Sequence, residues 1–98
     1  MLIGQRHHTA GNTTRFEVDY YNWLEDGRTI APTGFSAALA ADSTVTDVVI
    51  SNVSVTASKL YFFVSGGSVN ETFTLQTQVT DTLGEVVIDT VIFTVVAP

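Results

Sequence analysis

The 98-residue sequence predicts a single all-β sandwich. Short segments in which apolar and polar residues alternate follow one another, with turn signals every ~8–12 residues. Thr, Ser and Val are abundant and favour strands, and no segment requires a helix of ordinary length. The chain contains no Cys, so without disulfides it must be stabilised by its hydrophobic core or by partners. This pattern is typical of an immunoglobulin-like sandwich of about seven strands, which we place at residues 15–98, behind an extended N-terminal arm at residues 1–14.

The arm and the turns are recognised by composition. Residues 5–14 are polar with little periodicity, so an extended arm is expected, with a frayed terminus as the alternative. Asp-Gly at residues 26–27, Gly66-Gly67 and the loop at residues 81–85 are turn signals, and Gly84 is placed to take a positive φ. The expected strands and strand-like segments span residues 15–20, 29–31, 35–41, 48–55, 59–65, 72–80 and 86–96.

Alternation within these segments predicts which side chains face the core. In residues 59–65, Phe62 and Val64 face one way, and Tyr61 and Phe63 face the other. In residues 48–55, we group Val49 with Val53 and Val55, opposite Val48 and Ile50. The expected core consists of Phe16, Val18, Trp23, Leu60, Phe62, Phe73, Leu75, Val79, Val91 and Phe93.

The charge balance excludes some partners. Four Lys and Arg residues stand against ten Asp and Glu residues, and this net charge of −6 argues against binding nucleic acid or an anionic membrane. No run approaches ~20 apolar residues, so no transmembrane helix is expected, and the short apolar run at the start does not make a signal peptide. Only 14% of residues are charged, and a surface with so little charge suits a subunit of a larger assembly.

No residues suggest catalysis, a metal or a cofactor. Adjacent His7 and His8 on an extended segment point to opposite sides and chelate poorly, so a solvated arm is the expected interpretation. Glu17 and Asp19 share a strand face, which a solvated surface explains. Four aspartates in separate loops lack calcium-loop spacing, and Gly66-Gly67 lacks the Lys and the helix of a phosphate loop. The four aspartates are Asp26, Asp42, Asp47 and Asp81.

Apolar residues on strand faces that are expected to be exposed to solvent indicate contact with another subunit. If Phe62 and Val91 point inward, Tyr61, Phe63 and Ile92 point outward. Single exposed apolar residues are common, and a shift of one residue in our facing would reverse every side chain. The expected interface residues are Leu2, Ile3, Arg6, Tyr61, Phe63, Ile88 and Ile92.

Two groups of residues carry a family resemblance. The first is Asp19-Tyr20, Trp23-Leu24-Glu25-Asp26-Gly27 and Thr29-Ile30; the second is Phe63-Val64-Ser65-Gly66-Gly67, Phe73, Val79-Thr80-Asp81 and Gly84. From about Phe16 to the C-terminus, the chain resembles the small immunoglobulin-like virion proteins of tailed bacteriophages, the fibre–tail adaptor type. The family often has Tyr where this chain has Phe73, and residues 34–47 match poorly.

The resemblance implies a structural virion component without enzymatic activity, at the tail, the fibre or the head surface. It implies contacts with other virion proteins, a homo-oligomer in the particle, and assembly in the bacterial cytoplasm. The alternative is a carbohydrate- or receptor-binding immunoglobulin-like module. Such a module needs exposed aromatic side chains, for which Tyr20, Tyr21 and Trp23 are the candidates.

Overall fold

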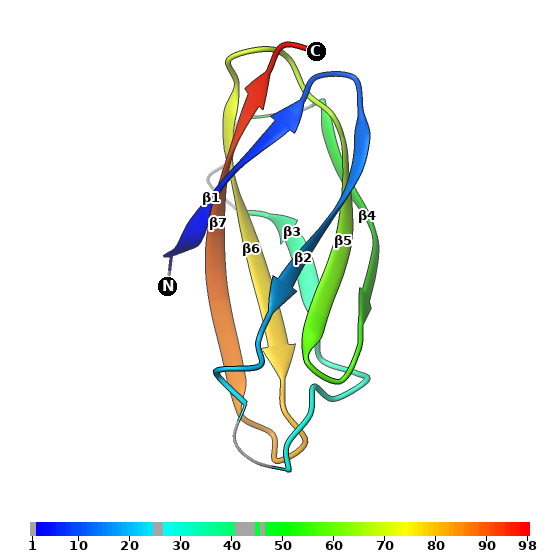
Figure 1. Ribbon diagram of the computed structural model, residues 1–98, viewed down its shortest axis with the longest axis vertical. Coiled ribbons are helices and arrows are strands. Elements are labelled where there is room, and N and C mark those ends of the chain that lie inside the picture. The colour runs from blue at the N-terminus through cyan, green and yellow to red at the C-terminus, as the bar shows by residue number, and fades with distance from the viewer. Residues whose placement is uncertain (1, 25–26, 41–44, 46) are drawn as a thin grey trace.

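The computed structural model describes residues 2–24, 27–40, 45 and 47–98. This part of the chain forms two packed sheets, which confirms the predicted β-sandwich (Figure 1). It contains no helix long and apolar enough to cross a membrane. The strands are β1 (Leu2–Thr9), β2 (Thr13–Asp19), β3 (Ser36–Leu39), β4 (Val48–Val55), β5 (Lys59–Gly66), β6 (Thr72–Thr80) and β7 (Val86–Val96).

The strand order is immunoglobulin-like. One sheet has the order β1-β7-β6-β3 and the other has the order β2-β5-β4. Neighbouring strands are antiparallel except β1 and β7, which run parallel. β6 and β7 are joined by the Asp81–Glu85 turn and pair along the whole of β6, so the strongest alternation in the sequence forms the longest hairpin.

The N-terminal segment differs from the expected arm. Its residues are extended, but β1 pairs with β7 from Thr90 to Val96 and is an edge strand of the four-stranded sheet. Two causes hide this strand in the sequence. Its pairing partner lies at the other end of the chain, and its buried position is occupied by His8 rather than by an aliphatic residue. The segment ahead of residue 15 is therefore part of the sandwich in this structure.

The core is centred on Phe93, which is fully buried. Its ring stacks on Phe73 at a centroid distance of 5.1 Å and meets Phe16 edge-on at 4.9 Å. Seven of the predicted core residues are buried, whereas Phe16, Val18 and Trp23 are partly buried against the core. Tyr20, Ile30, Ala37, Val48, Val64 and Val95 complete it.

Tyr20 belongs to the core because its hydroxyl has a partner. It lies just beyond β2, and its hydroxyl forms a 2.9 Å hydrogen bond with the hydroxyl of Thr77, which is itself fully buried on β6. Burial raises the pKa of Tyr20 above its ordinary value, and the bond to Thr77 opposes this rise. A buried hydroxyl needs such a partner, so this bond links the two sheets at a fixed point.

A bulge in β4 explains the wrong grouping of its valines. Between Ser51 and Ser54 the pairing with β5 shifts by one residue, and Asn52 takes a φ of 50°. The extra residue puts Val48 and Ile50 on the same side as the later valines of the strand. Val48 is therefore buried, whereas Val49 is 57% exposed, contrary to the prediction.

Asp81 organises the turn between β6 and β7. One carboxylate oxygen accepts hydrogen bonds from the backbone amides of Leu83 and Glu85, each at 2.9 Å. The other oxygen lies 3.1 Å from the Arg28 guanidinium, which also pairs with Glu85. Burial by itself would raise the pKa of Asp81, but the two amides and Arg28 outweigh it and hold the pKa below its ordinary value.

Asp81→Asn is expected to lower stability at pH 7 and to flatten the acid limb of the stability curve. A folded-state pKa below the unfolded one contributes stability above the unfolded pKa of about 3.9. That stability is lost as the pH falls through the folded pKa. Urea unfolding at pH 7 and at pH 3 measures the effect, and the difference between the wild type and Asp81→Asn should shrink at pH 3. The control is Glu17→Gln, at an exposed carboxylate paired with Lys59 at 3.7 Å. An equal difference at both pH values would contradict this assignment.

Candidate interaction surfaces

The histidines do not combine into a metal site. His8 was expected in a solvated arm but is 1% exposed, so that expectation was wrong. Its Nε2 lies 3.0 Å from the carbonyl oxygen of Gly66 and donates to it, because a carbonyl only accepts. His7 is exposed on the opposite side of β1. The described residues contain no group of three or more His, Cys, Asp or Glu that could hold a metal ion.

The carboxylates singled out in the sequence have structural partners or lie apart. Asp19 accepts a hydrogen bond from the backbone amide of Tyr21 at 2.9 Å. Asp47 precedes β4 and accepts a 2.7 Å hydrogen bond from Ser68, which lowers its pKa. Asp81 directly follows β6, whose last residues lie at the opposite end of the sandwich from the start of β4 (Figure 1). Glu25, Asp26 and Asp42 lie outside the described residues.

The three aromatic residues considered for glycan binding do not form an exposed cluster. Tyr20 is buried, and Trp23 packs edge-on against it at a centroid distance of 6.2 Å. Tyr21 alone of the three is widely exposed, at 72%. The carbohydrate-binding alternative was expected to use a cluster of exposed aromatic side chains beside polar groups, and these three residues do not supply that cluster.

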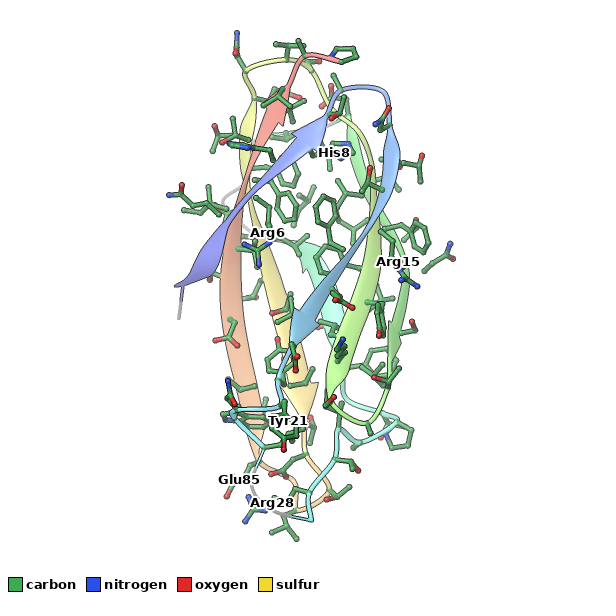
Figure 2. All side chains as sticks on the ribbon, viewed as in Figure 1. Arg6, His8, Arg15, Tyr21, Arg28 and Glu85 are labelled. Atoms are coloured by element: carbon green, nitrogen blue, oxygen red, sulfur yellow. The ribbon has the colours of Figure 1, made fainter. Side chains whose placement is uncertain are left out.

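A cavity of about 700 Å³ opens beside β2, between the two sheets. Its floor is the aromatic core, including Phe16, Phe62 and Phe93. Arg6 lines it from β1, in the space toward β2 (Figure 2). Its guanidinium donates to the backbone carbonyl of Gln5 at 3.0 Å. Sequence patterns miss this cavity because it forms between strands from both ends of the chain.

The outer face of the three-stranded sheet combines charge with aromatic surface. The Arg15 guanidinium lies 4.9 Å from the centre of the Tyr61 ring, a cation–π contact (Figure 2). Glu17 pairs with Lys59 on the same face. Tyr61 and Phe63 point outward as predicted and are partly exposed, and Val49 of β4 is exposed beside them. We call this the charged face, defined by Arg15, Glu17, Asp19, Lys59, Tyr61, Phe63 and Val49.

Among the described residues, the outer face of the four-stranded sheet carries no Asp, Glu, Lys or Arg side chain. The outward positions of β6 hold only Thr and Gln, and those of β7 hold only Val, Ile and Thr. Val86 is 53% exposed and Ile88 is 47% exposed, and Ile92 is partly exposed farther along β7. These outward directions confirm the predicted facing of β7. We call this the neutral face, defined by the outward residues of β1, β7, β6 and β3.

The remaining residues of the predicted interface lie on β1. Arg6 is exposed at the mouth of the cavity. The backbone of Leu2 and Ile3 lies in the same edge strand, at the end where β1 meets Thr90. The predicted interface residues therefore occupy three separate places: the charged face, the neutral face and the edge strand β1.

These features define a small β-sandwich with two chemically different outer faces. The chain belongs to the podophage GP4 fiber-tail adaptor protein family gp77, whose sequence model matches residues 8–94. This is a family of structural phage adaptor proteins, not of enzymes, so the chain is a structural tail component of a virion that contacts other virion proteins.

One solved structure shows the same fold. The crystal structure of a 2,6-sialyltransferase of Photobacterium sp. JT-ISH-224, in a ternary complex with CMP and lactose, superposes with a TM-score of 0.54 and 15% identity over 98% of this chain. This chain spans only 17% of the length of that enzyme, and the similarity shows the fold alone. No curated protein matches the sequence.

Proposed function

We propose that this domain joins two neighbouring subunits at the junction between the tail and a fibre, with one neighbour on each outer face. One observation carries this proposal: the two faces lie on opposite sides of a single sandwich and differ in chemistry. The charged face offers Arg15, Tyr61 and Phe63, a combination enriched at the centres of interfaces. The neutral face offers an apolar stripe on β7 beside uncharged polar side chains.

The edge strand β1 adds a third contact in this proposal. β1 has β7 on one side and no strand on the other within the described residues. An extended segment of a neighbour can pair with such an edge through backbone hydrogen bonds. Leu2 and Ile3 would take part through their backbone, and Arg6 would offer a cation beside them.

Phe63→Asp tests the charged face. The substitution is expected to leave the isolated domain folded, because Phe63 points away from the core, and to block its incorporation into particles. A carboxylate buried in an apolar contact is desolvated without a partner. Incorporation is therefore expected to fall by at least about tenfold, which is the size of effect found for hot-spot residues of interfaces. Circular dichroism checks the fold, and quantifying the protein in purified particles checks incorporation.

The matched control is Leu83→Asp. Leu83 is 69% exposed at the tip of the β6–β7 turn, away from both faces, so its replacement should not affect incorporation. Normal incorporation of folded Phe63→Asp would contradict the proposal for the charged face.

A further inference from the structure

The neutral face differs from the charged face in its content of charged side chains. Among the described residues, its outward positions contain no Asp, Glu, Lys or Arg, and the exposed His7 of β1 is its titratable side chain. Gln76 lies at its centre, between Thr90 of β7 and Ala38 of β3. Thr74 and Gln78 flank it on β6, and Ile88 and Ile92 lie opposite them on β7.

The charge of the chain lies elsewhere. Arg15, Glu17, Asp19 and Lys59 are on the opposite sheet, and the charges around Asp81 are at one end of the sandwich. Two copies of a chain with a net charge of −6 repel each other at most approaches. The neutral face lets two copies meet without placing like charges opposite each other.

The side chains of this face are also self-complementary. Thr and Gln each carry a donor and an acceptor, so a Thr can pair with a Thr and a Gln with a Gln across a two-fold axis. A contact around a two-fold axis brings the same patch of both subunits together. Thr and Gln side chains can hydrogen-bond to their own copies in such a contact, whereas two facing carboxylates would repel each other. The isoleucines on β7 supply apolar surface near the centre of this patch.

The size of the face decides how much of it a dimer must use. The four strands are 8, 11, 9 and 4 residues long. At about 3.3 Å per residue and about 4.8 Å between strands, they cover on the order of 500 Å² before side-chain relief is counted. A standard interface buries about 800 Å² per partner, so nearly the whole face must take part. Two sheets packed in this way lie about 10 Å apart with their strands within about 30° of each other.

We propose that the neutral face binds the neutral face of a second copy of this chain, giving a two-fold dimer of sandwiches packed sheet against sheet. The inference rests on the proposed function, since it identifies the neighbour on one of the two faces. The charged faces of the dimer then point away from each other, free for other virion proteins.

Gln76→Glu tests the contact with almost no change of shape. In a two-fold dimer this change puts two carboxylates near the axis, so the dissociation constant should rise by roughly tenfold or more. Sedimentation equilibrium of the full chain across about 1–500 μM measures it. Gln76→Lys should weaken the dimer similarly, and a 1:1 mixture of Gln76→Glu with Gln76→Lys should restore it. Val49→Asp, on the charged face, is the control and should dimerise like the wild type.

A wild type that stays monomeric over this range would overturn the inference, as would a Gln76→Glu variant that dimerises normally or a mixture that fails to restore the dimer. Particle incorporation separates this result from the proposed function. If the wild type is monomeric and folded Gln76→Glu still fails to enter particles, the neutral face binds a different virion protein. If Gln76→Glu loses the dimer but enters particles normally, the dimer exists and the adaptor role of this face is refuted.

Discussion

Phe93→Ala is expected to destabilise the domain by about 3–5 kcal/mol, the range for removing a large buried aromatic side chain. Phe93 is fully buried and touches aromatic rings of both sheets: Phe73 on its own sheet, and Phe16 and Phe62 on the other. The loss therefore removes contacts between the two layers and leaves a cavity that neither sheet can fill alone. A domain of this size has a total stability of roughly 5–15 kcal/mol, so the variant is at or near the limit of folding.

Thermal and urea unfolding followed by Trp23 fluorescence measure this loss. The melting temperature should fall by at least about 12 °C if the variant folds at all. Phe63→Ala is the matched control, because it removes the same side chain from an outward position on β5 and should cost no more than about 1–2 kcal/mol. Equal losses for the two variants would show that Phe93 is not the centre of the core.

Gly66→Ala is the second change with a large expected effect. Gly66 ends β5 with a φ of 82°, a conformation that costs an L-residue about 1–2 kcal/mol. A Cβ atom at this position would also overlap the backbone carbonyl oxygen of Asp47, which is held by the amide of Gly67. The carbonyl of Gly66 accepts the hydrogen bond from buried His8, so a shift of the backbone would also disturb β1. The total loss should exceed about 2 kcal/mol.

Gly11→Ala isolates the conformational part of this cost. Gly11 has the same φ of 82°, but a Cβ there meets nothing within 4 Å. Urea unfolding should therefore show a loss of only about 1–2 kcal/mol for Gly11→Ala and a clearly larger one for Gly66→Ala. If the two variants lose the same stability, the overlap with Asp47 is relieved by movement of the loop.

The C-terminal hairpin is a part of the fold that the sequence alone predicts well. The alternation of Phe73, Leu75 and Val79 and that of Val91, Phe93 and Val95 predicted both strands and their buried sides, and the structure confirms them. The turn was predictable for the same local reason, since Gly84 has the expected positive φ, of 90°. In this part of the chain, neighbours in the sequence are neighbours in the sheet, so local pattern and tertiary structure agree.

The errors arise where the fold depends on distant residues or on irregular backbone. The bulge at Asn52 reverses which alternate residues of β4 face the core, and no feature of residues 48–55 predicts this bulge. The burial of His8 depends on the carbonyl of Gly66, which the sequence does not place beside it. The outward apolar residues were recognised, but the neutral face emerges only once the order β1-β7-β6-β3 is known.

The parallel pairing of the first and last strands has a mechanical consequence. The start of β1 lies beside Thr90, in the middle of β7, whereas the chain ends beyond Val96 at one tip of the sandwich (Figure 1). Tension applied through the two ends of the chain would run along these strands and across the hydrogen bonds between them. Those bonds would be loaded together in shear rather than opened one after another, because β1 would be pulled from its start and β7 from its end, at opposite ends of a parallel ladder. A pair of strands joined in this way resists being pulled apart lengthwise.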